Sequence, residues 1–269
     1  MADTFRERGF IYMEIIDQLM AEGLLKTDME ILILCAGDFD KEVFERYGFT
    51  NVTISNLARN LKPDDFIPYA AKSLDAEAID LPDNSYDWCV VHAGLHHCAV
   101  PQNAILEMFR VARVGCFACE PVDSLMSRLS MRFGFSQRYE IGSVIDKLDD
   151  KGGGLRFGGI PNWIHRFSRE SVEQTIRTAH PEARHRFIML HRLVVPWYRF
   201  RGKWTPKSIL VKLLTPFLLL MQKSSLLANN IAFAVLKPKL PEDLHPWLKE
   251  ADGELRVDAK WVEENWRHH

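Results

Sequence analysis

Glu30-Ile-Leu-Ile-Leu-Cys-Ala-Gly-Asp38 decides the fold of this chain, because an unbroken apolar run leads directly into a turn of small residues. A continuous run rich in Ile and Leu is typical of a strand that is buried on both faces, as in a parallel sheet. Beyond the turn, Lys41–Tyr47 is expected to form a short helix that ends at Gly48. The stretch therefore predicts a strand, a tight turn and a helix, in the order found in βαβ units.

The remainder of the chain continues this alternation of strands and helices. The further expected strands are Asn51–Asn56, Tyr86–His92, Gly115–Cys119, His185–Val195 and Asn230–Lys237. The further expected helices are Thr4–Leu25, Pro101–Val111 and Lys203–Leu227. Prolines 63 and 68 instead predict a loop and a broken helix over Leu57–Lys72. Such alternation indicates an α/β fold with a doubly wound, mostly parallel sheet.

Composition and charge narrow the class of protein and its partners. The 34 Lys and Arg residues nearly balance the 36 Asp and Glu residues, so we expect no nucleic acid partner. The alternating aromatic and basic residues 197–204 are too short a stretch to change that expectation. The five cysteines form no regular framework, which favours a reducing, cytoplasmic location. Cys116 and Cys119 have C-x-x-C spacing, but on a strand they would face opposite ways, which indicates a structural role.

The apolar stretch Ile209–Leu227 is the part of the chain that could meet a membrane. Lysines, a glutamine and a proline interrupt it, so we expect no transmembrane helix. The charged Met1–Arg8 lacks the layout of a signal peptide. We expect the helix over 207–227 to pack on the edge of the sheet or on a second subunit in a homodimer. Peripheral contact with a membrane surface is the alternative.

Three segments, in this order, resemble the class I S-adenosylmethionine (SAM) dependent methyltransferases, in the small-molecule subgroup often called type 11. They are Ile31–Gly37, Asp75–His97 and Ala104–Gly115. The resemblance implies a Rossmann-like sheet of seven strands in the order 3-2-1-4-5-7-6, mostly parallel with an antiparallel edge strand. It also implies SAM as the cofactor.

The resemblance places the cofactor at the turn after the first strand and at two later loops. Of the family's three glycines Gly37 alone is present, and Cys35 and Phe39 take the other two positions. Phe39 either narrows the methionine pocket or indicates a different path for the loop. Asn56 stands at the position where the family has an acidic residue that forms hydrogen bonds with the ribose hydroxyls. Asp75 matches the family's acidic residue that forms a hydrogen bond with the adenine amino group. The full set of expected cofactor residues is Cys35, Ala36, Gly37, Asp38, Asn56, Asp75, Ala76, Glu77 and His92.

The acceptor site is expected beside the histidine pair that follows the strand Tyr86–His92. His96 and His97 are the candidate catalytic residues, because a histidine there can act as a general base at neutral pH. The alternative is that they only pack or form hydrogen bonds in the loop. The expected substrate residues are Glu120, Asp123, Asn162, Trp163, His165 and Arg166. The histidines 165, 180, 185 and 191 lack zinc-ligand spacing with cysteines, so we expect no metal site.

These patterns predict one methyltransferase-like domain over residues 1–269. We expect residues 124–167 to form an inserted region for the substrate, in which the glycine-flanked residues 158–167 act as a lid. We expect residues 203–227 to form a helical insertion and residues 238–269 to form a C-terminal extension. The expected function is SAM-dependent methyl transfer to a small-molecule or sugar-type acceptor. The alternative is a non-catalytic binding module of the same fold that has lost the glycine turn.

Overall fold

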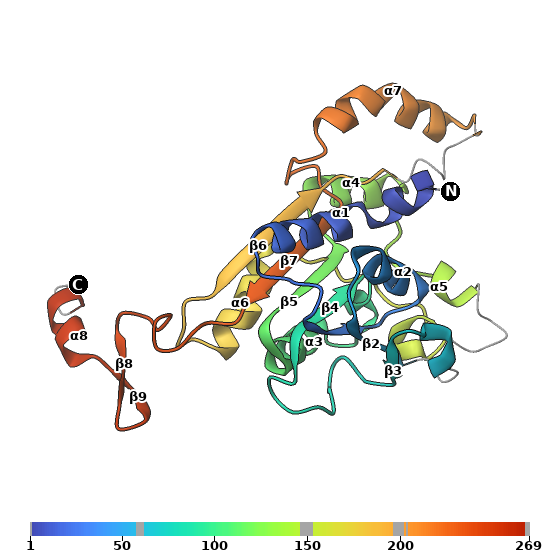
Figure 1. The fold of residues 1–269 in the computed structure, drawn as a ribbon. Helices are drawn as coiled ribbons and strands as arrows, with labels where there is room; N and C mark the ends of the chain where they lie inside the picture. The colour runs from blue at the N-terminus through green and yellow to red at the C-terminus, as the bar shows by residue number, and fades with distance from the viewer. Residues whose placement is uncertain (1, 58–61, 146–152, 196–201, 203, 267–269) are drawn as a thin grey trace.

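Helices cover both faces of a seven-stranded sheet in the computed structural model, which describes residues 2–57, 62–145, 153–195, 202 and 204–266 (Figure 1). The strands are β1 Glu30–Leu34, β2 Asn51–Ser55, β3 Ala70–Lys72, β4 Tyr86–His92, β5 Ala112–Pro121, β6 Arg186–Arg192 and β7 Asn230–Leu236. Their order is β3-β2-β1-β4-β5-β7-β6, which confirms the expected order. β7 is antiparallel to both neighbours, β5 and β6, while the other pairs are parallel. β6 and β7 therefore form the expected antiparallel pair at one edge.

The helices that pack on the sheet are divided between its two faces. The α-helices are α1 Ala2–Ala21, α2 Asp38–Tyr47, α3 Pro101–Val111, α4 Leu125–Arg132, α5 Gly142–Ile145, α6 Arg169–Ala179, α7 Pro206–Leu220 and α8 Ala259–Asn265. Short 3-10 helices lie at η1 Pro63–Phe66, η2 Leu95–His97 and η3 Leu155–Phe157. In β1, Ile31 and Ile33 pack with side chains of α1 and α2, whereas Leu32 and Leu34 pack with those of α3 and α6. The unbroken apolar run of β1 thus supplies both halves of the core.

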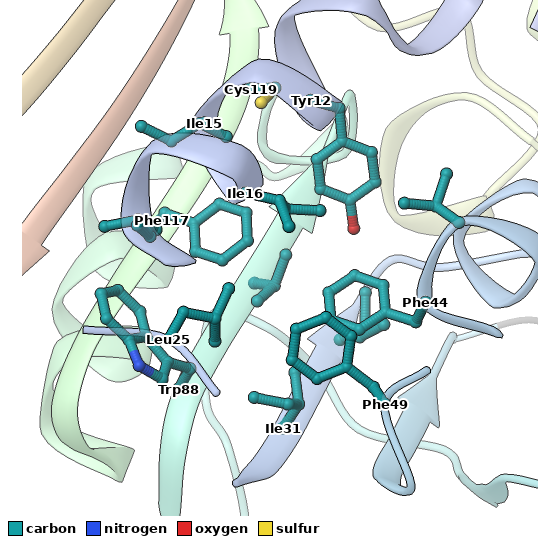
Figure 2. Close-up of a cluster of buried hydrophobic side chains, with 14 of the residues drawn as sticks. Tyr12, Ile15, Ile16, Leu25, Ile31, Phe44, Phe49, Trp88, Phe117 and Cys119 are labelled. Carbon is teal, nitrogen blue, oxygen red and sulfur yellow. The ribbon is translucent and has the colours of Figure 1, made fainter. Parts of the chain in front are cut away.

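Aromatic side chains fill the core between the sheet and helices α1 and α2 (Figure 2). Phe44 of α2, Trp88 of β4 and Phe117 of β5 are all fully buried. Burial of a large apolar side chain stabilises a fold by about 1.5–3 kcal/mol. The indole nitrogen of Trp88 donates a hydrogen bond to the carbonyl oxygen of Leu24 at 3.1 Å, so its polar group is satisfied as well. This packing fixes α1 over the sheet.

Cys116 and Cys119 lie on opposite faces of β5, as the strand spacing predicts. Cys119 belongs to the core under α1 and α2, and Cys116 to the core under α3 and α6. Both thiols are buried and free. Burial raises the pKa of Cys116 to about 12, so this thiol stays protonated and unreactive.

Two segments differ from the sequence-based expectation. The end of the predicted loop over Leu57–Lys72 forms the edge strand β3, because Ala70–Lys72 pairs in parallel with residues 53–55 of β2. β5 begins at Ala112, three residues before the expected start, so it follows α3 without a loop. Neither segment carries an apolar run of its own, and pairing with a neighbouring strand sets both boundaries.

Helix α7 and the segment that follows β7 extend away from the sheet (Figure 1). α7 lies apart from the strands, and most of the expected aromatic and basic stretch 197–204 before it falls outside the described residues. β8 Leu248–Ala251 and β9 Glu254–Val257 form a separate antiparallel hairpin, which α8 follows. Over the part of the chain that the structure describes, no helix has both the length and the apolar character needed to span a membrane.

Candidate functional site

A cavity of about 210 Å³ opens where three parallel strands end. Cys35 follows β1, Asn56 follows β2 and Ala93 follows β4, and all three residues line it. Most of the remaining wall is formed by residues 74–77, by His97, and by Gly153, Gly154, Arg156 and Phe157. Ligands of doubly wound folds bind at this edge of the sheet.

The turn after β1 is held tightly against its neighbours. The side-chain amide of Asn56 donates a hydrogen bond to the carbonyl oxygen of Ala36 at 2.7 Å. Cys35 has a φ of 54°, in the left-handed region that non-glycine residues rarely adopt. A Cβ atom on Gly94 would lie 2.4 Å from the Cβ of Cys35, so the loop after β4 can approach only because residue 94 is a glycine. The loops after β1 and β4 therefore form one rigid wall.

The second half of the turn faces α1. Gly37 caps α2, and its backbone N–H donates to Asp40 Oδ2 at 3.0 Å. The Phe39 ring lies against α1, since its Cζ is 2.8 Å from the position of a Cβ built on Gly9. Among the described residues of the cavity wall, neither Phe39 nor Asp38 is present. Phe39 therefore does not line the described wall of this cavity.

His92 lies beside that turn, with its side chain 18% exposed. Its ring stacks on Tyr12 with centroids 4.5 Å apart, and its Nδ1 is 3.8 Å from Asp40 Oδ1. Burial lowers the pKa of His92 to about 4. Burial also raises the pKa of Asp40 to about 7, against the opposing effect of the hydrogen bond from Gly37. Of the expected cofactor residues, His92, Ala36, Gly37 and Asp38 thus lie outside the described cavity wall.

Asp75, Ala76 and Glu77 line the cavity from the loop before β4. Glu77 holds the start of α3, because its carboxylate accepts hydrogen bonds from the backbone N–H groups of Ala99 at 3.0 Å and Val100 at 2.7 Å. Asp75 accepts the backbone N–H of Glu77 at 3.0 Å and forms an ion pair with Arg156. Arg156 Nε also lies 3.3 Å from Glu77 Oε2. The inserted region therefore reaches the acidic loop through Arg156.

His96 is held in a pocket of carboxylates. Its Nδ1 lies 2.6 Å from Glu120 Oε2, and Glu120 Oε1 accepts the backbone N–H groups of Gly94 at 2.8 Å and Leu95 at 2.7 Å. Burial alone would lower the pKa of His96, but the charges of Glu120 and Glu140 outweigh it and raise the pKa to about 10. Glu120, expected to contact the substrate, holds His96 and the backbone of its loop.

His97 faces the cavity wall, and Glu140 bridges the two histidines. Glu140 Oε2 lies 3.3 Å from His96 Nε2 and 3.3 Å from His97 Nε2. Burial and the charge of His96 lower the pKa of His97. Glu140 and Arg156 were not among the expected site residues, because each is an isolated charged residue in an insertion without periodicity. The glycines that flank Arg156 were the available signal for a loop that closes over the sheet.

The remaining expected substrate residues support the insertion. Asn162 donates its side-chain N–H to the carbonyl oxygen of His96 at 2.9 Å, and Arg166 donates to the carbonyl oxygen of Gln137 at 2.8 Å. Asp123 is ion-paired with Arg128. The other two make ring contacts, Trp163 with Tyr139 and His165 with Phe167. Within the described part of the insertion, the wall is built by Ser143 and residues 153–157 rather than by the expected lid 158–167.

Residues 42–119 match the family model described as a methyltransferase domain. No curated protein matches the sequence.

Solved structures of similar fold share little sequence with this chain. The [4+2]-cyclase SpnF is 15% identical, with 84% of this chain and 80% of that chain covered and a TM-score of 0.47. A putative methyltransferase from Bacillus halodurans is 13% identical, with 83% and 98% covered and a TM-score of 0.47. Phosphoethanolamine N-methyltransferase 2 of Haemonchus contortus, in complex with SAM, is 11% identical, with 87% and 57% covered and a TM-score of 0.47.

The family-model match covers β2, β3, β4 and most of β5, so it includes Asn56, residues 74–77 and His97 of the cavity wall. The strand order of the whole sheet is the one that the resemblance implied. Together, the match over residues 42–119 and the order of the seven strands support a class I methyltransferase domain in this chain.

Proposed function

We propose that this protein is a SAM-dependent methyltransferase that acts on a small-molecule or sugar-type acceptor. The observation that supports it is one cavity that joins three expected cofactor residues, Cys35, Asn56 and Asp75, to the candidate catalytic residue His97. When bound, SAM supplies an electrophilic methyl group for an in-line displacement. The protein's own task is then to align the acceptor and to exclude water.

The polar groups of the cavity fit the adenosine part of SAM. Asp75 would hold the adenine amino group and Asn56 the ribose hydroxyls, with Cys35, Ala76 and Glu77 beside them. At about 210 Å³ the cavity is smaller than the roughly 300–1,000 Å³ of most small-molecule pockets. We infer that residues 153–157 move outward when the cofactor binds, and that Arg156 then releases Asp75.

The acceptor would lie beside His97. His97 lines the cavity, whereas His96 is turned toward Glu120. We therefore assign the catalytic role to His97 and a positioning role to His96. The substrate contacts expected from Glu120, Asp123, Asn162, Trp163, His165 and Arg166 become indirect in this proposal, because these residues support the loops around the pair.

A calorimetric titration with SAM and with its demethylated product tests the proposal. We expect both to bind at one site per chain. If neither binds, the alternative of a non-catalytic binding module is favoured. The free state of all five cysteines supports the proposal of a cytoplasmic location, where thiols stay reduced.

A different observation supports peripheral contact of α7 with an anionic membrane surface. Leu213 and Leu220 of α7 are 74% and 81% exposed. The sequence contains no acidic residue between Glu182 and Glu242, so all charged side chains in the segment that includes this exposed apolar helix are basic. Apolar side chains combined with basic ones bind the surface of anionic bilayers. We propose this contact in place of packing on the edge of the sheet, and association into a homodimer through α7 is the outcome that would contradict it.

A further inference from the structure

Three side-chain atoms beside the cavity have the spacing of metal ligands. His96, His97 and Glu140 each offer one ligand atom, a ring nitrogen or a carboxylate oxygen, and these three atoms lie within 4.8 Å of one another. Each histidine nitrogen is 3.3 Å from the glutamate oxygen. In a tetrahedral site the ligand atoms are separated by about 1.6 bond lengths, so bonds of about 2.0–2.2 Å to Zn²⁺ separate them by about 3.3–3.6 Å. The two nitrogen–oxygen distances fall in that range.

Glu140 Oε2 lacks a hydrogen bond that would account for its position. The atom is buried and, among the described residues, has no hydrogen-bond partner of suitable geometry. Two histidine nitrogens lie 3.3 Å from this oxygen, and a buried carboxylate oxygen without a well-directed hydrogen bond is costly, by about 1–3 kcal/mol. A cation held between the three atoms would remove that cost.

The surroundings of His96 are those of a metal-bound histidine. Glu120 Oε2 accepts the hydrogen from His96 Nδ1 at 2.6 Å, which leaves Nε2 as the atom that faces Glu140. Two backbone N–H groups hold the other oxygen of Glu120. A carboxylate bonded to the far nitrogen of a histidine fixes the ring and raises its basicity as a ligand.

We propose that His96, His97 and Glu140 form a binding site for a divalent transition-metal ion of the Zn²⁺ type, with one coordination position open to an oxygen ligand. Two histidines and one glutamate are a ligand set of catalytic zinc sites, which keep a fourth position for water or substrate. Because His97 also lines the cavity, the ion lies at the cavity wall. The competing occupant of the site is a proton on His96 Nε2, held between Glu120 and Glu140.

This inference goes beyond the proposed function and changes the role of His97. With an ion on Nε2, His97 cannot take a proton. The ion itself lowers the pKa of a hydroxyl bound to it, which suits an acceptor that carries oxygen. Metal binding is measured without SAM or acceptor, so a failure of the metal site leaves the methyltransferase proposal standing, and the reverse also holds.

The test is metal binding by the intact chain after removal of metals with a chelator. We expect calorimetry to show one Zn²⁺ per chain, and Co²⁺ to give the visible absorption bands of a low-symmetry site with nitrogen ligands. His97→Ala and Glu140→Gln should each weaken Zn²⁺ binding by more than about a hundredfold. Glu120→Gln, which alters the carboxylate that holds both the His96 ring and the backbone of Gly94 and Leu95, should weaken it by about ten- to a hundredfold.

A histidine–glutamate pair outside the site provides the matched control. His180 Nδ1 lies 3.5 Å from Glu182 Oε1, after α6. His180→Ala should leave Zn²⁺ affinity and the Co²⁺ spectrum unchanged. The proposal is overturned if the wild-type chain binds Zn²⁺ no more tightly than the His97→Ala variant, or if wild-type protein leaves the spectrum of aqueous Co²⁺ unaltered. The Co²⁺ measurement needs no variant, so it decides even where a substitution impairs folding.

Discussion

Arg156 is ion-paired with Asp75, although 81 positions separate the two residues in the chain. The pair joins the inserted region to the loop that carries the expected adenine contact. Arg156 also approaches Glu77, so one guanidinium lies against both acidic residues of the loop. The side chain of Asp75 is therefore engaged by the protein itself before any ligand is considered.

Removal of Arg156 should favour cofactor binding. Because an exposed ion pair contributes about 0–1 kcal/mol, Arg156→Ala should raise SAM affinity by up to about fivefold in calorimetry. Arg128→Ala, which removes the ion pair with Asp123 away from the cavity, is the control and should have no effect. A lower affinity in Arg156→Ala would mean that this arginine contacts the cofactor rather than competing with it.

Asp75→Ala should weaken SAM binding by about ten- to a hundredfold, because a hydrogen bond to a buried group is worth about 1–3 kcal/mol. Asp123→Ala removes a carboxylate outside the described cavity wall and should leave the affinity unchanged. Unchanged affinity in Asp75→Ala would refute the assignment of this residue to the adenine.

His97→Ala should lower the rate of methyl transfer at least about tenfold while SAM affinity stays within about twofold, since the cofactor contacts lie on other loops. Binding by calorimetry and turnover by product formation separate the two effects. His245→Ala, in the C-terminal extension beside Trp247, is the control. Full turnover in His97→Ala would make the histidine structural, and alignment alone would account for catalysis.

Asp40 should make the protein less stable as the pH rises from about 4 to 7. Its pKa in the folded state is about 7, above the value of 3.8 in the unfolded chain, because burial disfavours the charge. Over this window the unfolded chain releases the proton first, so the free energy of unfolding falls with rising pH, by a few kcal/mol in total. His92, whose pKa burial lowers to about 4, contributes a rise over part of the same window, so the effect of Asp40 is measured as a difference between variant and wild type. In urea denaturation at pH 4, 5.5 and 7, the stability of Asp40→Asn relative to the wild type should increase with pH.

Asp123 supplies a comparison of opposite sign. The hydrogen bond from Arg128 lowers the pKa of Asp123, so its ionised form stabilises the folded state at higher pH and loses this effect in acid. Asp123→Asn should therefore not reproduce the behaviour of Asp40→Asn. If both variants keep the pH profile of the wild type, burial of Asp40 does not govern it.

Leu213→Glu with Leu220→Glu should abolish binding of the chain to vesicles of anionic lipid. We expect the wild type to sediment with phosphatidylglycerol vesicles at low salt, and less at high salt, but not with phosphatidylcholine vesicles. Leu255→Glu, at an exposed position of β9, is the control. Loss of a dimer in gel filtration, without any vesicle binding by the wild type, would assign α7 to a subunit interface instead.

The sequence predicts the centre of the fold better than its margins, for physical reasons. β1 and β4 carry unbroken apolar runs because both of their faces are buried, so their patterns are independent of the neighbours. Ala70–Lys72 becomes a strand only by pairing with β2, and no local pattern indicates it. The resemblance to a known family supplied the order of the strands, which periodicity alone does not fix.

The candidate site divides in the same way. Asn56 and His97 follow predictable strands, and their approach to one another was expected from the edge that parallel strands share. Asp75 follows β3, which the sequence did not indicate, and only the resemblance to a known family placed it at this edge. Glu140 and Arg156 come from the insertion, and only tertiary packing brings them to the cavity. His92 was expected among the cofactor residues, and its ring stacks on Tyr12 beside the turn after β1, outside the described cavity wall.

The contacts of Glu120 determine how much of this chain would have to be moved to transfer the histidine pair into another protein. Its one carboxylate accepts from the backbone of Gly94 and Leu95 and from the ring of His96, so loop shape and ring direction are a single unit. A graft of residues 94–97 alone would lose both at once. The smallest portable module is that loop together with the end of β5, which carries the glutamate.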